Sequence, residues 1–149
     1  MRKFLCAVGV MVAVLLVAGV VSSPAGAASR VQLGYIRYNT PGPDLPVRNW
    51  RLNGEYVTLH NTSAAAIRMR GWALYDRDGH GFGFGAFTLG PHASVRIHTG
   101  HGRATATDRY WNMDYYVWTN TGDRARLRDQ YGRLLDQCHW GAGLGWINC

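Results

Sequence analysis

The sequence predicts an all-β protein, a β-sandwich of about seven to nine short strands. The first observation is strict alternation: in residues 55–60, Val57 and Leu59 share one face, and polar residues occupy the other. Residues 94–98 repeat the pattern, with Val95 and Ile97 on one face. The second observation is that turn residues separate such runs at regular intervals. No helical period or internal repeat appears after residue 27, so a two-layer β architecture is expected.

Residues 1–27 have the features of a secretory signal peptide. Arg2 and Lys3 precede an apolar run over residues 4–21, and small residues at positions 25–27 suit a cleavage site. An uncleaved membrane anchor is the alternative, because the run approaches the length of a membrane span. We expect cleavage, an exported protein, and one domain formed by residues 28–149.

The first half of this domain contains one expected strand at 32–38 and a second at 55–60. Residues 39–44 are rich in proline and glycine and are expected to form an irregular loop. Asn53 and Gly54 suit a tight turn into the second strand, and residues 61–63 suit a turn out of it.

A change of phase is expected near Gly71. Ile67 and Met69 would face one side, whereas Trp72 and Leu74 continue the apolar series one residue out of step. Because a slip of one residue moves a whole strand to the other face, we expect a bulge or strand break at Gly71.

The second half suits hairpins. Asp78 and Gly79 are typical of a tight turn between strands at 72–75 and 82–87, and a turn at 130–132 would join strands at 124–128 and 133–139. The residues expected to meet in the core are Val57, Leu59, Trp72, Leu74, Val95, Ile97 and Leu127. Cys138 and Cys149 are the only cysteines after the leader, and in an exported chain they are expected to form a disulfide.

Four segments together resemble the lamin tail domain family. They are residues 55–62 (EYVTLHNT), 71–80 (GWALYDRDGH), 87–100 (FTLGPHASVRIHTG) and 118–127 (WTNTGDRARL). The resemblance extends from about residue 32 to residue 139 and is nearest to exported bacterial single-domain members. It implies an immunoglobulin-like sandwich. It transfers framework residues and no catalytic centre, which suits an accessory binding or adaptor module.

The charge pattern suggests a ligand. Lys3 is the only lysine and Arg2 lies in the leader, so of 16 basic residues 14 arginines remain against nine acids, a net charge of +5. Such an excess suits nucleic acid or an anionic cell-wall polymer, although it also serves solubility. Six arginines fall in the outward phase of expected strands and could form a phosphate-binding face: Arg68, Arg70, Arg96, Arg124, Arg126 and Arg128.

The alternative ligand is carbohydrate. Aromatic residues gather at 110–118, and an exposed subset could stack on sugars. If residues 115–118 alternate as a strand, Tyr115 and Val117 face one side and Tyr116 and Trp118 the other, so one pair is expected in the core and the other partly exposed. The candidates for stacking are Tyr110, Trp111, Tyr116 and Trp118. Core packing is the competing explanation for these rings.

A metal-dependent hydrolase is the third and most distant possibility. Its ligands would be His98, His101 and Asp108, or Asp76, Asp78 and His80. Both groups have simpler structural explanations, and neither a nucleophile elbow nor a second glutamate beside Glu55 is present. We therefore expect a monomer without enzymatic activity, metal or other cofactor.

Overall fold

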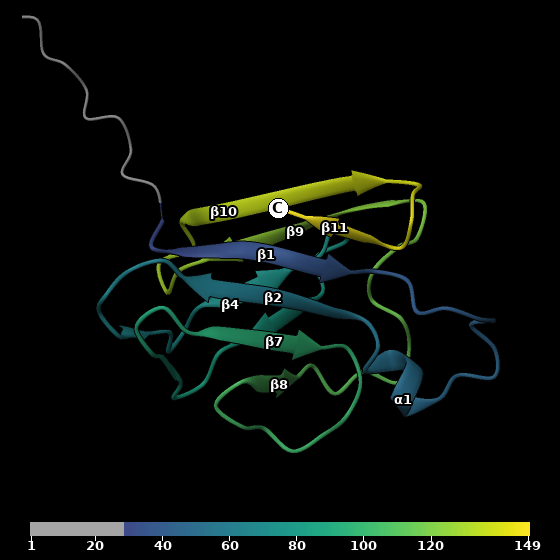
Figure 1. Ribbon diagram of the computed structural model, residues 1–149, viewed down its shortest axis with the longest axis horizontal. Coiled ribbons are helices and arrows are strands. Elements are labelled where there is room, and N and C mark those ends of the chain that lie inside the picture. The colour runs from purple at the N-terminus through teal and green to yellow at the C-terminus, as the bar shows by residue number, and fades with distance from the viewer. Residues whose placement is uncertain (1–28) are drawn as a thin grey trace, which may run out of the picture.

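The computed structural model describes residues 29–149 and confirms the all-β prediction. A five-stranded sheet has the order β11-β1-β2-β7-β8, a four-stranded sheet has the order β10-β9-β4-β5, and β3 pairs with β6 (Figure 1). The predicted signal peptide lies outside the described residues. The strands are β1 (Val31–Arg37), β2 (Tyr56–Asn61), β3 (Ile67–Arg68), β4 (Ala73–Tyr75), β5 (Gly81–Gly83), β6 (Thr88–Leu89), β7 (Ser94–His98), β8 (Asp108–Tyr110), β9 (Gly122–Arg128), β10 (Leu134–Gly141) and β11 (Trp146–Asn148).

The described chain has more strands than expected, because several pairings involve only two or three residues. It also contains one short helix, α1 (Asn49–Leu52), which the sequence pattern did not predict; its Leu52 is buried. Within residues 29–149, no helix has the length and apolar character needed to cross a membrane.

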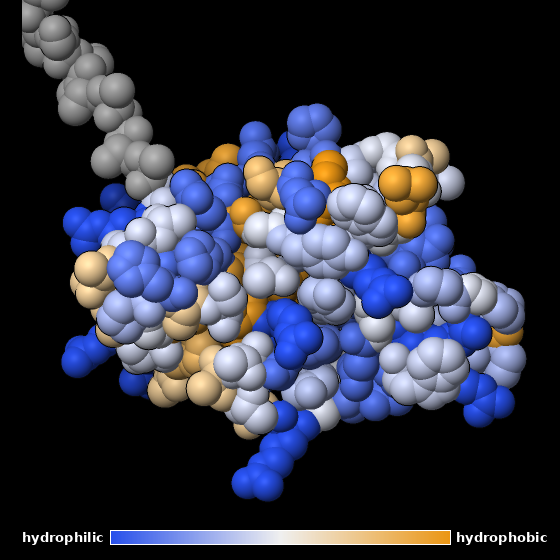
Figure 2. Space-filling model, viewed as in Figure 1, coloured by the Kyte–Doolittle hydropathy of each residue, from blue (hydrophilic) through white to orange (hydrophobic). Residues whose placement is uncertain are grey.

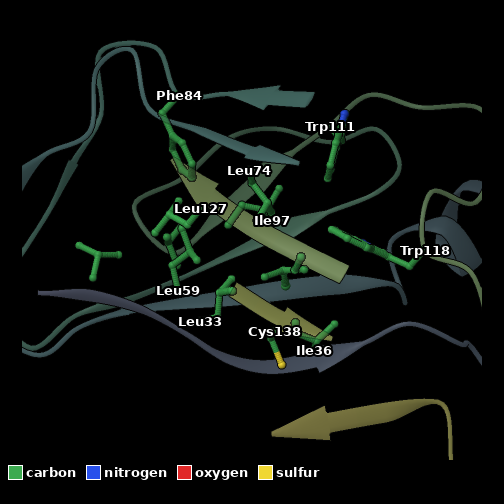
Figure 3. Packing of buried hydrophobic residues seen from close by; sticks show 14 of the residues in the cluster. Leu33, Ile36, Leu59, Leu74, Phe84, Ile97, Trp111, Trp118, Leu127 and Cys138 are labelled. Carbon is green, nitrogen blue, oxygen red and sulfur yellow. The ribbon is translucent and has the colours of Figure 1, made fainter. Parts of the chain in front are cut away.

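The core lies between the two larger sheets, as Figure 3 shows. Val57 and Leu59 of β2 pair with Ile97 and Val95 of β7, and all four are buried. In the four-stranded sheet, Leu74 of β4 pairs with Leu127 of β9. Six of the seven predicted core residues are therefore buried. Trp72 is only partly buried, and its indole Nε1 donates a hydrogen bond to Gln130 Oε1 at 2.9 Å.

The predicted break occurs at Gly71. Strand β3 ends at Arg68, and Gly71 has φ of +80°, a left-handed conformation that glycine tolerates best. The chain then enters β4 in a different sheet, so Met69 and Leu74 are both buried despite their opposite phases.

Both predicted hairpins are present. The turn containing Asp78 and Gly79 joins antiparallel β4 and β5, and β9 and β10 pair across the turn that follows Asp129. Strand β5 ends at Gly83, earlier than predicted, because Phe84 and Phe87 turn into the core from an irregular segment.

A disulfide joins the two sheets at one edge of the sandwich. The predicted disulfide links Cys138 of β10 to Cys149, which follows β11. Strands β10 and β11 are edges of different sheets, so the bond joins the two layers. Beside it, the Leu33 amide of β1 donates to Asp136 Oδ2 of β10 at 2.8 Å.

Candidate functional site

The six predicted binding arginines do not form one continuous face. Arg124, Arg126 and Arg128 lie on β9 of the four-stranded sheet, whereas Arg96 lies on β7 of the five-stranded sheet. Arg68 ends β3, and Arg70 follows it. The prediction of a single stripe is wrong, because β9 has β4 and β10 as neighbours, and not β3 or β7.

The β9 group remains a coherent cationic surface, which we call the β9 face. Ala125 and Leu127 are buried, so the three arginines between and beside them point outward. Arg126 Nη2 donates to the carbonyl oxygen of Asp76 at 2.5 Å, and Arg128 Nη1 donates to that of Gly132 at 2.7 Å. Within residues 29–149, no carboxylate lies within ion-pair distance of these guanidinium groups.

An open pocket of about 420 Å³ continues this face toward the start of β9. Arg77, Arg124, Gln137 and His139 line it, and His139 is the register partner of Arg124. Arg77 Nη1 donates a hydrogen bond to the Gly122 carbonyl oxygen at 2.9 Å. Its Nε lies 3.5 Å from Asp78 Oδ1. The pocket therefore adds Arg77, Gln137 and His139 to the donors that the β9 face presents.

Asp123 positions this pocket. Its buried carboxylate accepts hydrogen bonds from the backbone amides of Arg77 and Arg124 through Oδ1 and from that of Thr119 through Oδ2. These bonds hold the hairpin that carries Arg77 against the start of β9. Because the Asp123 carboxylate is buried and bonded to backbone amides, it forms no ion pair with the arginine side chains of the pocket.

The remaining arginines have different surroundings. Arg68 and Arg70 line a separate pocket of about 310 Å³ with Phe87. Arg96 forms an ion pair with Asp108 at 3.0 Å. Burial raises the pKa of Asp108, but hydrogen bonds from Thr107 and His98 and the charge of Arg96 lower it below its ordinary value. Arg96 is thus already neutralised by a carboxylate.

The predicted aromatic platform is wrong for its two tryptophans. Trp111 is 7% exposed and Trp118 is 2% exposed, and the two indoles pack edge to face in the core (Figure 3). Residues 115–118 form no strand, so the alternation used to place Tyr116 and Trp118 does not apply. Tyr110 and Tyr116 are partly buried, and Tyr110 belongs to a different row of rings.

That row crosses the outer face of the five-stranded sheet, and we call it the aromatic row. It contains one ring from each strand: Trp146, Tyr35, Tyr56, His98 and Tyr110. Sequence reasoning missed four of these rings as a group, because they are scattered over the chain and only the strand order brings them together. The outward phase of Tyr56 beside Val57 was the available signal.

The predicted metal ligands form separate pairs. His98 Nε2 lies 2.9 Å from Asp108, whereas His101 Nε2 lies 2.9 Å from Asp114. His80 Nδ1 contacts Asp76 Oδ2 at 2.5 Å, and this hydrogen bond raises the pKa of His80. In the part of the chain that the structure describes, no three His, Cys, Asp or Glu residues gather as a metal site would require.

Comparison with known proteins identifies the family of the chain. No curated protein is similar to the chain. The model of the lamin tail domain matches residues 24–142, which include β1 to β10. These domains have an immunoglobulin-like fold and are not known as catalytic, in agreement with the sandwich described above. The chain therefore belongs to the lamin tail domain family.

Proposed function

We propose that the protein is an exported, monomeric and non-catalytic binding module that holds a phosphodiester polymer on its β9 face. The observation that carries this proposal is the set of three outward arginines on one strand. Arg126 and Arg128 contact carbonyl oxygens, and none of the three is ion-paired to a carboxylate among the described residues. Guanidinium groups whose backbone contacts leave other N–H donors available suit bidentate binding of phosphate.

The pocket at the start of β9 supports the same ligand. Arg77, Arg124 and Gln137 present side-chain N–H groups around a volume that can accept a phosphate and part of its linker. Nucleic acid and a teichoic-acid type of wall polymer share this phosphodiester chemistry. Binding of this kind is governed by counterion release, with Kd values of roughly 10⁻⁴ to 10⁻⁶ M at physiological salt.

The test compares two charge-matched variants, Arg124→Gln and Arg103→Gln. Arg124 lines the pocket on β9, and Arg103 is exposed in the loop before β8, so each variant loses one positive charge. Affinity for duplex DNA and for teichoic acid is measured between about 50 mM and about 200 mM salt. For Arg124→Gln we expect weaker binding and a salt slope smaller by about one; for Arg103→Gln we expect no change in slope.

The two polymers distinguish the sources of the ligand. Binding of DNA alone indicates that the nucleic-acid helix matters, and binding of teichoic acid alone indicates a wall polymer. If neither polymer binds at the lower salt concentration, or if both variants lose affinity equally, the β9 face is not the site. Hydrolysis of nucleic acid, glycan or peptide that follows the protein through purification contradicts the non-catalytic part of the proposal.

A further inference from the structure

The aromatic row is continuous across all five strands of its sheet. Successive ring centroids from Trp146 to Tyr35, Tyr56, His98 and Tyr110 lie 5.8, 5.8, 5.5 and 5.1 Å apart. Strands β11, β1, β2, β7 and β8 follow one another from the top to the bottom of Figure 1, so the row runs across the strands. The rings form a narrow line across the sheet, in which Trp146 and Tyr35 stack on each other, as do His98 and Tyr110.

The rings lie on the outside of the sandwich. Their neighbours Ile36, Val57 and Ile97 are buried, so the alternating residues point away from the core. Trp146 is 44% exposed, and the three tyrosines are partly exposed. Over these strands Figure 2 shows pale residues of intermediate hydropathy among strongly hydrophilic ones. Trp146 and the three tyrosines can therefore be reached from solvent, whereas His98 is only 9% exposed.

Charge on this face is balanced, unlike charge on the β9 face. Arg96 stacks over the Tyr56 ring at 5.9 Å and is neutralised by Asp108 at 3.0 Å. Arg37, in register with Tyr56 and Trp146, is a second cation beside the row, and within the described residues it has no ion-paired carboxylate. One unpaired arginine does not suit a polyanion, which needs several phosphate contacts along its length.

Uncharged polar groups lie beside the rings. Thr58 is the β2 residue two positions after Tyr56 on the same face, and it pairs with Arg96 of β7. His60 and Ser94 follow on that face, with His60 Nδ1 2.9 Å from Ser94 Oγ. Hydroxyl and imidazole groups can donate to and accept from sugar hydroxyls, while ring faces cover the apolar sides of pyranose units.

We infer that the aromatic row binds a neutral glycan chain, stacked on Trp146, Tyr56 and their neighbours. This site lies on the opposite outer face from β9 and does not depend on the proposed phosphodiester binding. Its ligand belongs to the carbohydrate class that the sequence suggested, but it uses Tyr110 alone among the four residues that were predicted for that role.

The experiment measures binding of a chitin hexasaccharide and a cellulose hexasaccharide to the purified chain by calorimetry. Trp146→Ala and Tyr56→Ala are expected to weaken binding roughly three- to tenfold each, as the loss of a stacked ring implies. Trp50→Ala and Tyr131→Ala are the matched controls, because both rings are exposed and lie outside the row. Both controls are expected to bind as the unchanged protein does.

Three further measurements test the inference: a conservative variant, a salt series, and binding of single-stranded DNA. Trp146→Phe retains a ring on β11 and is expected to restore most of the affinity lost in Trp146→Ala. Binding is expected to change little between about 50 mM and about 200 mM salt, because it does not release counterions. The inference is wrong if neither hexasaccharide binds, if Trp50→Ala weakens binding as much as Trp146→Ala, or if single-stranded DNA is the ligand that depends on Trp146 and Tyr56.

Discussion

Glu55 is the only glutamate of the chain, and the fold buries it. Its side chain is 1% exposed, and Thr99 Oγ1 donates to its Oε2 at 3.0 Å. Burial raises its pKa from 4.5 to about 8, although hydrogen bonds from Thr99 and from the backbone of Val117 and Trp118 oppose the change. The carboxyl group is therefore protonated in the folded protein at neutral pH.

The stability of the protein is expected to fall as pH rises from about 5 to about 8. The folded state holds a proton on Glu55 in this range and the unfolded state releases it, so deprotonation favours unfolding. Across the full range, the loss in free energy of unfolding is on the order of 4 kcal/mol. Urea unfolding at a series of pH values measures it. Glu55→Gln is expected to flatten the profile, and an equally steep profile in this variant would contradict the role of Glu55.

Asn61 stabilises two loops from a buried position. Its Nδ2 donates to the carbonyl oxygens of Ala65 at 2.7 Å and Gly90 at 2.8 Å, and its Oδ1 accepts from the amide and hydroxyl of Ser63. Asn61→Ala removes all four of these part-buried hydrogen bonds at once, so we expect the free energy of unfolding to fall by about 2 to 4 kcal/mol. Thr62→Ala, at the exposed neighbour, is expected to cost under about 1 kcal/mol in the same denaturant titration.

At the scale of elements, β11 is held by a short backbone pairing with β1 and by a disulfide. It contributes three residues to the edge of the five-stranded sheet, and Cys149 directly after it is bonded to Cys138. Because β11 also carries Trp146, the disulfide holds one end of the aromatic row.

Replacing Cys138 and Cys149 by serine is expected to lower the free energy of unfolding by about 2 to 3 kcal/mol, the loop-closure contribution of a short disulfide loop. The same variant is expected to lose more glycan affinity than DNA affinity, because Trp146 lies inside the closed loop and the arginines of β9 lie outside it. Equal stability of the oxidised protein and the double variant would show that β11 is held by its backbone pairing alone.

The sequence predicted those elements whose pattern is local. Alternation located β2 and β7, and Asp78 with Gly79 located the β4–β5 hairpin. Strands β8 and β11 were missed, since three residues are too few to show a period. The aromatic run at 115–118 was placed by strand alternation although it forms no strand, which is why Trp118 was wrongly expected on the surface.

At the scale of the whole molecule, the binding surfaces depend on strand order, which the sequence does not state. Each predicted arginine was assigned to the outward face of its strand, but only the topology shows that Arg96 and Arg124 belong to different sheets. In the same way, Tyr35 and Trp146 are 111 residues apart in the chain and 5.8 Å apart as rings. The sandwich thus separates an arginine face from an aromatic face.

The central claim is that these two faces bind different ligands, and amide chemical-shift mapping of one labelled sample tests it most directly. Duplex DNA is expected to shift residues of β9 and of the pocket lined by Arg77 and His139. The chitin hexasaccharide is expected to shift Tyr35, Tyr56 and Trp146 instead, and each ligand should leave the other set in place. Shifts of the same residues by both ligands, or shifts on neither face, would contradict the account.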